Sequence, residues 1–358
     1  RGVVSTCSYE ARRFGVHSAM PSAEAQRLCP QAIWTHGHFD RYHEVSAQVM
    51  AILADETPRV ERVSIDEAFI DITPGRFAPE DPLLVARRIS DRVAALGVTC
   101  SIGVGCNKTV AKIASERDKP FGLTIVRPGT EQRFLAALPV SAMSGIGRSA
   151  EERLRRMRIY TLGELSRAPE STLASIFGVN GERMRQRALG LEISEVTSLD
   201  EEREVKSVSN ERTFAKDLTE REDIEAAIAL LGESVGRRLR RQGLTGTTVT
   251  LKLKYSYGSG RSAQRRLPHP TDDENIFVAV ALELLDNIWQ EGMHVRLAGI
   301  GMSDFDHQGG IQTDLFCEID DRGAQSSDRR DLSVTIDAVR DKFGDSALSF
   351  GRQSRFND

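Results

Sequence analysis

The stretch of this chain that decides its fold reads Val63-Ser64-Ile65-Asp66-Glu67-Ala68-Phe69-Ile70-Asp71. Valine, isoleucine and phenylalanine are typical of β-strands, and the acidic pair Asp66-Glu67 interrupts them. Adjacent residues of a regular strand point to opposite faces, so two neighbouring carboxylates can share a ligand only where the chain turns. The pattern therefore predicts a tight β-hairpin with both carboxylates at its tip. Such a pair suits Mg²⁺, which prefers oxygen ligands and leaves positions open for phosphate oxygens, whereas a solvated acidic turn is the alternative.

Composition restricts the class of protein to which this hairpin belongs. The 358 residues are enough for two or three domains, and 40% hydrophobic with 28% charged residues is ordinary for a soluble globular protein. The formal net charge is −4, so any surface that binds nucleic acid must be local. Five scattered cysteines lack a CxxC spacing, which predicts free thiols and a cytoplasmic location. No apolar run reaches the length of a membrane span, so we expect no membrane partner.

Helical and strand patterns alternate around the hairpin in the order of a split βαβ, or ferredoxin-like, layout without its first strand. The expected elements are a helix at 41–55, the hairpin, a helix at 82–96, a strand at 99–105, a helix at 108–117 and a strand at 123–126. The sequence starts at Arg1 in the strand-like Val3-Val4-Ser5. We therefore expect the central first strand of the sheet to lie upstream of Arg1.

From Gly129 the composition becomes helical. The loop Ser144-Gly145-Ile146-Gly147 leads into an arginine-rich helix at 148–157. This pattern resembles a helix-hairpin-helix, in which glycines let backbone N–H groups at the start of a helix meet a DNA phosphate. The candidate DNA ligands are Gly145, Gly147 and Arg148, and a plain turn between two helices is the alternative.

A second α+β unit follows a polar, highly charged segment at 195–205, which is the best candidate for a linker. Alternation in residues 249–255 places Thr250, Lys252 and Lys254 on one face of a strand and apolar residues on the other. Basic residues of the next strand would extend this face into a stripe that binds phosphates, and a solvated sheet face is the alternative. These further candidates are Arg261, Arg265 and Arg266.

Several motifs occur in order along the chain, and together they resemble those of a known family. They are Ser5-Thr6-Cys7-Ser8-Tyr9-Glu10-Ala11-Arg12-Arg13-Phe14-Gly15-Val16, Ser64-Ile65-Asp66-Glu67-Ala68-Phe69-Ile70-Asp71, Ser101-Ile102-Gly103-Val104, Asn107-Lys108, Ala111-Lys112-Ile113-Ala114-Ser115, Lys119-Pro120-Phe121-Gly122 and Ser144-Gly145-Ile146-Gly147. This set is similar to the fingerprint of Y-family DNA polymerases of the bacterial polymerase IV (DinB) type.

The resemblance implies a multidomain α+β fold with a ferredoxin-like palm, truncated at its N-terminus, small fingers, a helical helix-hairpin-helix thumb and a separate α+β little finger. The boundaries we expect are fingers 1–38, palm 39–128, thumb 129–194, linker 195–205, little finger 206–305 and a tail at 306–358.

The resemblance also implies a translesion, low-fidelity DNA polymerase that acts in DNA repair and damage tolerance. It would extend the primer strand of a primer–template DNA by two-metal phosphoryl transfer, as a monomer. Asp66 and Glu67 would be its catalytic carboxylates and hold two Mg²⁺ ions. Positive charges and hydroxyl donors would bind the incoming deoxynucleoside triphosphate. The residues that match this role are Thr6, Tyr9, Arg12 and Lys119, and Lys108 and Lys112 are further candidates for primer or phosphate contacts.

The chain departs from the family pattern in two ways. The family's first metal carboxylate and its bulky residue that excludes ribonucleotides belong to the strand expected upstream of Arg1, so neither can be located. We therefore expect residues 1–358 alone to have poor stability and little activity. In addition, Cys7 stands where alanine is usual, and Phe121 follows Pro120 where asparagine is common.

A motif that follows the second α+β unit predicts a further binding partner. Gln312-Thr313-Asp314-Leu315-Phe316 resembles the short peptide by which bacterial polymerases dock on the β sliding clamp. An anchored glutamine and two apolar side chains would enter a preformed pocket, so the clamp-binding residues are Gln312, Leu315 and Phe316.

Two other function classes stay open. One is a catalytically silent protein that binds DNA and the clamp, which the unlocated carboxylate allows. The other is a different two-metal phosphotransferase or nuclease on the same scaffold. Tyr9, Arg12 and Lys119 argue against a nuclease, because a nuclease needs no triphosphate pocket.

Overall fold

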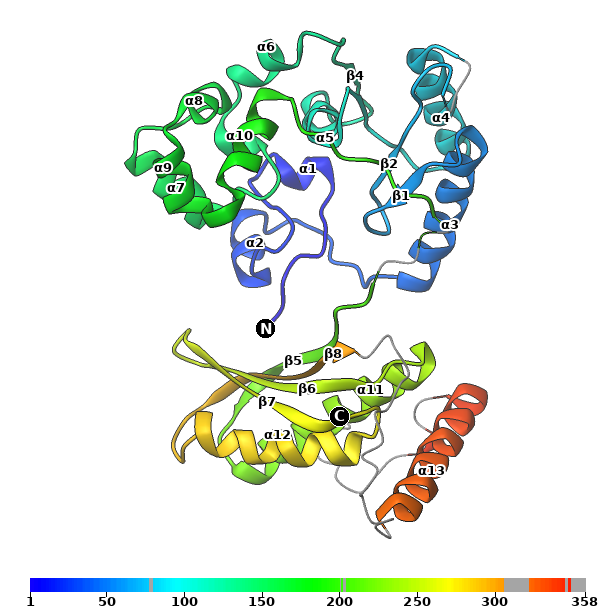
Figure 1. Ribbon diagram of the computed structural model, residues 1–358, viewed down its shortest axis with the longest axis vertical. Coiled ribbons are helices and arrows are strands. Elements are labelled where there is room, and N and C mark those ends of the chain that lie inside the picture. Colours follow the sequence, from blue (N-terminus) through cyan, green and yellow to red (C-terminus); the bar gives the residue numbers. More distant parts are fainter. Residues whose placement is uncertain (77–79, 200, 202–203, 306–321, 345–346, 349–358) are drawn as a thin grey trace, which may run out of the picture. The chain divides into compact units, whose positions relative to one another are not determined.

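The computed structural model describes residues 1–76, 80–199, 201, 204–305, 322–344 and 347–348 (Figure 1). Internal contacts divide the chain into two compact units. The N-terminal unit comprises Ser5–Met20 and Glu24–Glu202, and the C-terminal unit comprises Arg203–Asp358 with Arg1–Val4 and Pro21–Ala23. Within the described part of the chain, no helix is both long and apolar enough to cross a membrane.

The expected elements around the acidic hairpin are present in the N-terminal unit, with shorter strands than predicted. In chain order they are α3 (Phe39–Glu56), β1 (Val60–Arg62), β2 (Ala68–Ile70), α4 (Pro82–Ala95), β3 (Ile102–Val104), α5 (Lys108–Arg117) and β4 (Leu123–Ile125). β1 pairs with β2 in antiparallel fashion and β3 pairs with β4 in parallel fashion, so the described strands of this unit form two separate two-stranded sheets. Two short helices precede them, α1 (Tyr9–Arg12) and α2 (Ser22–Leu28).

Helix α5 is placed by its cap and by a glycine. Asn107 caps it, because the Asn107 side-chain oxygen accepts a hydrogen bond of 3.0 Å from the N–H of Val110. Gly103 on β3 faces this helix so closely that a Cβ atom there would lie 2.0 Å from the carbonyl oxygen of Ala111. Only glycine allows this approach. The close packing fixes the position of α5, which carries Lys108 and Lys112.

The helical half of this unit shares a core with α5. Val110 and Ile113 of α5 are buried together with Leu135, Leu154 and Leu162 of the helices that follow. This shared apolar core stabilises the packing of the helical half against α5. The elements that follow β4 are α6 (Glu131–Ala136), η1 (Val140–Ala142), α7 (Arg148–Arg156), α8 (Leu162–Arg167), α9 (Glu170–Phe177), η2 (Gly178–Asn180) and α10 (Gly181–Leu189).

The C-terminal unit is built on a four-stranded antiparallel sheet with the order β5-β8-β6-β7, and two helices pack on one face of it (Figure 1). The strands are β5 (Ser207–Leu218), β6 (Gly246–Tyr255), β7 (Gly260–Thr271) and β8 (Val295–Phe305), and the helices are α11 (Arg221–Gln242) and α12 (Glu274–Ile288). Val249, Leu251 and Leu253 of β6 are fully buried in the core beneath these helices. Both α11 and α12 lie on the same face in Figure 1, and we call the opposite face of the sheet the open face.

The helix expected near residues 332–343 is longer than predicted and forms α13 (Arg322–Phe343). Ion pairs attach it to α11. Asp337 lies 2.7 Å from Arg240, Asp341 lies 2.7 Å from Arg237, and Arg340 pairs with Glu233. The sequence indicated a loop-like tail with one amphipathic helix, and the structure shows which element that helix docks against.

Candidate active site and nucleic-acid interface

The acidic pair lies at the tip of the β1–β2 hairpin, as the sequence predicted. The backbone N–H groups of Val63 and Ser64 donate to the carbonyl oxygen of Glu67, at 2.9 and 3.1 Å, and so close the turn. Asp66 is exposed at this tip, and its carboxylate accepts a hydrogen bond from the hydroxyl of Ser64. The turn removes the strand alternation that would send the two carboxylates to opposite faces.

A chain of ion pairs leads from the hairpin to Lys119. The ammonium group of Lys112 lies 3.0 Å from a carboxylate oxygen of Glu67 and 3.2 Å from one of Glu116. That same oxygen of Glu116 lies 2.7 Å from the ammonium group of Lys119. The structure therefore connects a predicted metal ligand to a predicted triphosphate ligand. Glu116, the carboxylate in the middle, was not among the residues that the sequence singled out.

These ion pairs determine the protonation states of Lys112 and Glu116. Burial works against the charged form of Lys112, but hydrogen bonds from Lys112 to Glu67 and Glu116 outweigh it and raise the pKa of Lys112. Burial likewise works against the charged form of Glu116, and the two lysines outweigh it, so the pKa of Glu116 is lowered. Lys112 and Glu116 are therefore both charged near neutral pH.

The other triphosphate candidates lie on and before helix α1. Ser8 caps this helix by accepting a hydrogen bond of 3.3 Å from the N–H of Ala11. The guanidinium of Arg12 lies 5.8 Å from the centre of the Tyr9 ring, a distance typical of a cation–π contact. Thr6, Tyr9 and Arg12 are all exposed. Their convergence with Lys119 on one triphosphate stays a prediction.

Lys108 contacts the β1–β2 hairpin, and its predicted contact with primer or phosphate stays a prediction. Its ammonium group pairs with Glu61 of β1, whose carboxylate also accepts a hydrogen bond of 3.2 Å from the N–H of Thr197. Lys108 also lies 6.0 Å from the centre of the Phe69 ring. These contacts hold the hairpin to α5, which is a structural use of the lysine.

The donor set at the hairpin fits magnesium. Among the described residues, no group of three or more His, Cys, Asp or Glu gathers in a way that could hold a metal ion. Asp66 and Glu67 offer only hard carboxylate oxygens, which Mg²⁺ prefers, and Mg²⁺ commonly completes its shell with water and phosphate oxygens. Two adjacent carboxylates therefore suit this ion, while the binding of a metal at Asp66 and Glu67 stays a prediction.

The glycine loop before α7 leaves the start of that helix without a side-chain cap. Gly145 has a φ of 95°, and Gly147 caps α7 without a side-chain hydrogen bond to the first helical N–H groups. Space around Gly147 is open, and Arg148 is exposed beside it. Arg187 of α10 braces this loop, since it donates to the carbonyl oxygen of Ser144 and to the hydroxyl of Thr109 on α5, both at 2.8 Å.

The sheet of the C-terminal unit confirms one part of the predicted basic stripe and contradicts another. Residues directly opposite each other on neighbouring strands share a face. Thr248, on the same face as Lys252 and Lys254, is paired with Arg266 of β7. Arg266 therefore joins the two lysines on the open face.

The prediction that Arg261 and Arg265 share that face is wrong. Arg261 is paired with Leu253 and Arg265 with Val249, and both of these β6 residues are buried under the helices. Arg265 confirms this placement by forming an ion pair with Glu283 of α12. Adjacent residues such as Arg265 and Arg266 cannot point to the same face of a regular strand.

Comparison with known proteins decides the family. Residues 1–116 match the impB/mucB/samB family, and residues 205–315 match the C-terminal domain of the same family. The DNA polymerase IV of Lactococcus lactis subsp. cremoris is 39% identical over 307 residues, which cover 85% of this chain and 84% of that protein. The chain belongs to the Y-family DNA polymerases of the DNA polymerase IV (DinB) type.

Other relatives agree with this assignment to the Y-family. The DNA polymerase IV of Dehalococcoides mccartyi is 36% identical over 360 residues, which cover 100% of this chain and 90% of that protein. Among solved structures, a Y-family DNA polymerase chimera matches with a TM-score of 0.74 and 25% identity, over 85% of this chain and 88% of that one. The insertion ternary complex of Dbh DNA polymerase matches with a TM-score of 0.54 and 25% identity, over the same shares. The predicted family and multidomain α+β fold are confirmed, while the domain boundaries and the roles of single residues stay predictions.

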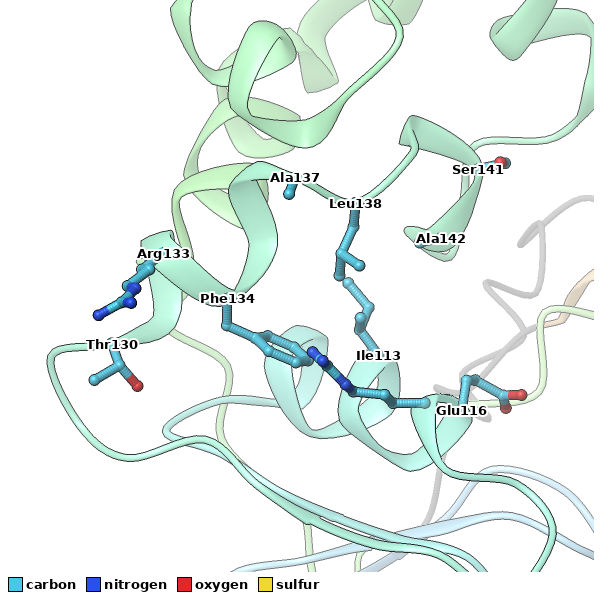
Figure 2. A pocket seen from close by; sticks show the side chains of 10 residues that line it. Ile113, Glu116, Thr130, Arg133, Phe134, Ala137, Leu138, Ser141 and Ala142 are labelled. Carbon is cyan, nitrogen blue, oxygen red and sulfur yellow. The ribbon is translucent and has the colours of Figure 1, made fainter.

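A cavity of about 770 Å³ adjoins the ion-pair chain of this Y-family member. Figure 2 shows Ile113, Phe134 and Leu138 lining it, with Glu116 at its edge. Arg117 also lines it and lies 5.6 Å from the centre of the Phe134 ring. The cavity is lined by residues of α5, α6 and η1, and α5 is also the helix that carries Lys112.

Proposed function

We propose that this protein is a template-directed DNA polymerase of the translesion, low-fidelity class, which acts in DNA repair and damage tolerance. The observation that carries this proposal is the adjacent pair Asp66 and Glu67 at a hairpin tip, connected through Lys112 and Glu116 to Lys119. Carboxylates for a metal and cations for a triphosphate are the two requirements of nucleotidyl transfer.

In this reaction the primer 3′-hydroxyl attacks the α-phosphorus of a deoxynucleoside triphosphate, and pyrophosphate leaves. Asp66 and Glu67 would hold two Mg²⁺ ions, which supply positive charge to the attacking and leaving oxygens when bound. Lys119 and Arg12 would neutralise the triphosphate, and the hydroxyls of Tyr9 and Thr6 would donate to its oxygens. The first carboxylate and the ribonucleotide-excluding residue of the family are not assigned to any position of this chain.

Lys112 has two anionic partners, Glu67 and Glu116. Its ammonium group pairs with Glu67 at 3.0 Å. If Glu67 held a metal ion, the ammonium group of Lys112 would be free to bind phosphate oxygens. Glu116 keeps Lys112 and Lys119 together, at 3.2 and 2.7 Å, near the place where a triphosphate would need both.

Two surfaces are suited to hold duplex DNA through its backbone. The N–H groups at the start of α7, after Gly145 and Gly147 and next to Arg148, would bind one phosphate. On the open face of the second unit, Lys252, Lys254 and Arg266 would bind others. Phosphate contacts carry no sequence information, as a polymerase that copies any template requires.

A clamp-binding role for the late motif rests on sequence alone. Gln312, Leu315 and Phe316 lie outside the described residues. The proposal is that they attach the polymerase to the β sliding clamp, which would keep it at a primer end.

Primer extension with Mg²⁺ tests the proposed function in the protein expressed from its native coding sequence. Asp66→Asn and Glu67→Ala should each lower the turnover rate by orders of magnitude, while affinity for primer–template DNA stays near that of the wild type. Asp71→Asn is the matched control, because Asp71 follows the same hairpin and accepts hydrogen bonds from Thr73 within its own turn. Full extension by the Asp66 or Glu67 variants would refute the assignment. A wild-type protein that binds DNA but never extends a primer would favour the catalytically silent alternative.

A further inference from the structure

One acidic side chain lies on the open face of the sheet, among the residues proposed to hold DNA. Glu211 of β5 is paired with Gly299 of β8, and Gly299 is paired in turn with Lys252 of β6. The three residues therefore form one row across three strands of the same face. A carboxylate oxygen of Glu211 lies 2.7 Å from the ammonium group of Lys252, across the strand that separates them.

Gly299 makes this contact possible. A Cβ atom at Gly299 would lie 2.6 Å from Cγ of Glu211, which is closer than real side chains approach each other. The Glu211 side chain thus lies over the bare backbone of the central strand and reaches Lys252 on its far side. A larger residue at position 299 would clash with Glu211 and displace its side chain from the surface of the sheet.

The neighbouring basic residues of this face have no such acidic partner in their rows. Lys254 is paired with Gly260 on one side and with Leu297 on the other. Arg266 is paired with Thr248. Arg265 of β7 has an acidic partner, Glu283 of α12, but that ion pair lies on the face that the helices cover. Lys252 is therefore distinguished from Lys254 and Arg266 by a carboxylate that crosses a strand to meet it.

We propose that Glu211 limits how tightly the open face holds the DNA backbone, by competing with phosphates for Lys252. This inference rests on the proposed function, because it takes the open face to be a DNA-binding surface. A phosphate that meets Lys252 must displace Glu211, and it then lies beside a carboxylate of like charge. An exposed ion pair is weak by itself, with side chains here 41% and 37% exposed, so the lysine can exchange partners. The result is weaker binding of the DNA backbone by the open face.

Equilibrium binding of a fluorescent primer–template duplex, measured over a range of salt concentrations, tests this proposal. Glu211→Gln keeps the size of the side chain and removes its charge. It should tighten binding about three- to tenfold at low salt and steepen the log–log salt dependence by up to about 0.9, as expected for one added phosphate contact. Glu225→Gln is the matched control, since Glu225 is on helix α11 and pairs with Arg221 at 2.6 Å. The control should leave both quantities near the wild-type values, although it changes the net charge equally.

A double-mutant cycle assigns the effect to Lys252. Lys252→Gln should weaken binding less in the wild-type protein than in the Glu211→Gln background, because Glu211 competes with phosphates for the lysine, and the gain from Glu211→Gln should be absent once Lys252 is replaced. Thermal melting of each variant confirms that it is folded. Binding by Glu211→Gln equal to or weaker than that of the wild type, or a gain that survives loss of Lys252, would overturn the proposal. Absence of salt-sensitive DNA binding in the wild type would instead refute the proposed function itself.

Discussion

The ammonium group of Lys112 lies 3.0 Å from the carboxylate of Glu67, so the helix α5 is joined to the tip of the acidic hairpin by opposite charges. A metal ion at Glu67 would compete with this lysine for the same carboxylate. The pair therefore joins a predicted metal ligand to a candidate phosphate ligand.

Replacing Lys112 should separate these two functions. Lys112→Met removes a positive charge beside the metal site, so we expect binding of Mn²⁺, measured by calorimetry, to tighten several-fold. The same variant should raise the KM for deoxynucleotides, because a cation near the triphosphate is lost. Lys216→Met, at an exposed strand position of the other unit, is the control for lost charge. Weaker metal binding by the Lys112 variant would contradict this account.

Loss of a triphosphate contact should appear in the KM for the nucleotide. A hydrogen bond to a charged group contributes about 1.5–3 kcal/mol, so Arg12→Ala and Lys119→Ala should each weaken nucleotide use by roughly ten- to a hundredfold. Steady-state primer extension over a range of nucleotide concentrations measures this. Arg13→Ala is the control, because Arg13 is the exposed neighbour of Arg12. Equal effects of the Arg12 and Arg13 changes would argue against a specific role for Arg12.

The ion-pair chain shows what sequence reasoning can and cannot find at this site. The spacing of Lys112, Glu116 and Lys119 is that of neighbours on a helix and its end, so their contacts could have been predicted. The contact of Lys112 with Glu67 could not, because it depends on how α5 packs beside the hairpin. That packing depends on the close approach at Gly103, which a pattern of apolar residues does not reveal.

The carboxylate of Glu56 joins α3 to α4, and its contribution to stability should be lost at low pH. The side chain of Glu56 is 6% exposed and accepts hydrogen bonds from Arg88, at 2.5 Å, and from Arg92, at 3.4 Å. The bond from Arg88 is the main reason why the pKa of Glu56 is lower than the usual 4.5. Because the folded pKa is depressed, this stabilisation is present above pH 4.5 and is lost as the pH falls through the folded value.

The corresponding variant is Glu56→Gln. At pH 7 it should lower the free energy of unfolding by about 1–3 kcal/mol, the range for hydrogen bonds to charged groups. The difference from the wild type should shrink as the pH falls below 4.5, which melting curves between pH 7 and pH 3 would measure. A difference that stays constant over this range would show that the charge of Glu56 is not what stabilises the protein.

Clamp docking makes a prediction that is independent of the active site. Changing Leu315 and Phe316 to alanine removes both apolar anchors of the motif. Synthesis stimulated by the sliding clamp should be lost, while clamp-free primer extension stays near normal. Changing Asp314 to alanine, directly before the two apolar anchors, is the control. Equal clamp binding before and after loss of both anchors would rule this role out.

The basic stripe shows where strand patterns mislead. The alternation in β6 was sufficient to place Lys252 and Lys254 on the open face. The face of each arginine in β7 depends on the register between β6 and β7, which the hairpin between them sets. That register places Arg266 opposite Thr248 and Arg265 opposite the buried Val249. Charge counting along the sequence cannot distinguish these two positions.

The two faces of β6 and β7 therefore supply a matched comparison for DNA binding. Lys254→Gln with Arg266→Gln removes two charges from the open face, and Arg261→Gln with Arg265→Gln removes two from the face that the helices cover. Each phosphate contact contributes about 0.9 to the log–log slope of affinity against salt, so the open-face pair should reduce the slope by roughly 1.8. The helix-face pair should change it little, because long-range attraction between exposed charges is screened within about a Debye length. Fluorescence anisotropy of a primer–template duplex between low and moderate salt measures both slopes. Equal reductions by the two pairs would mean that net charge alone, and not the geometry of the open face, holds the DNA.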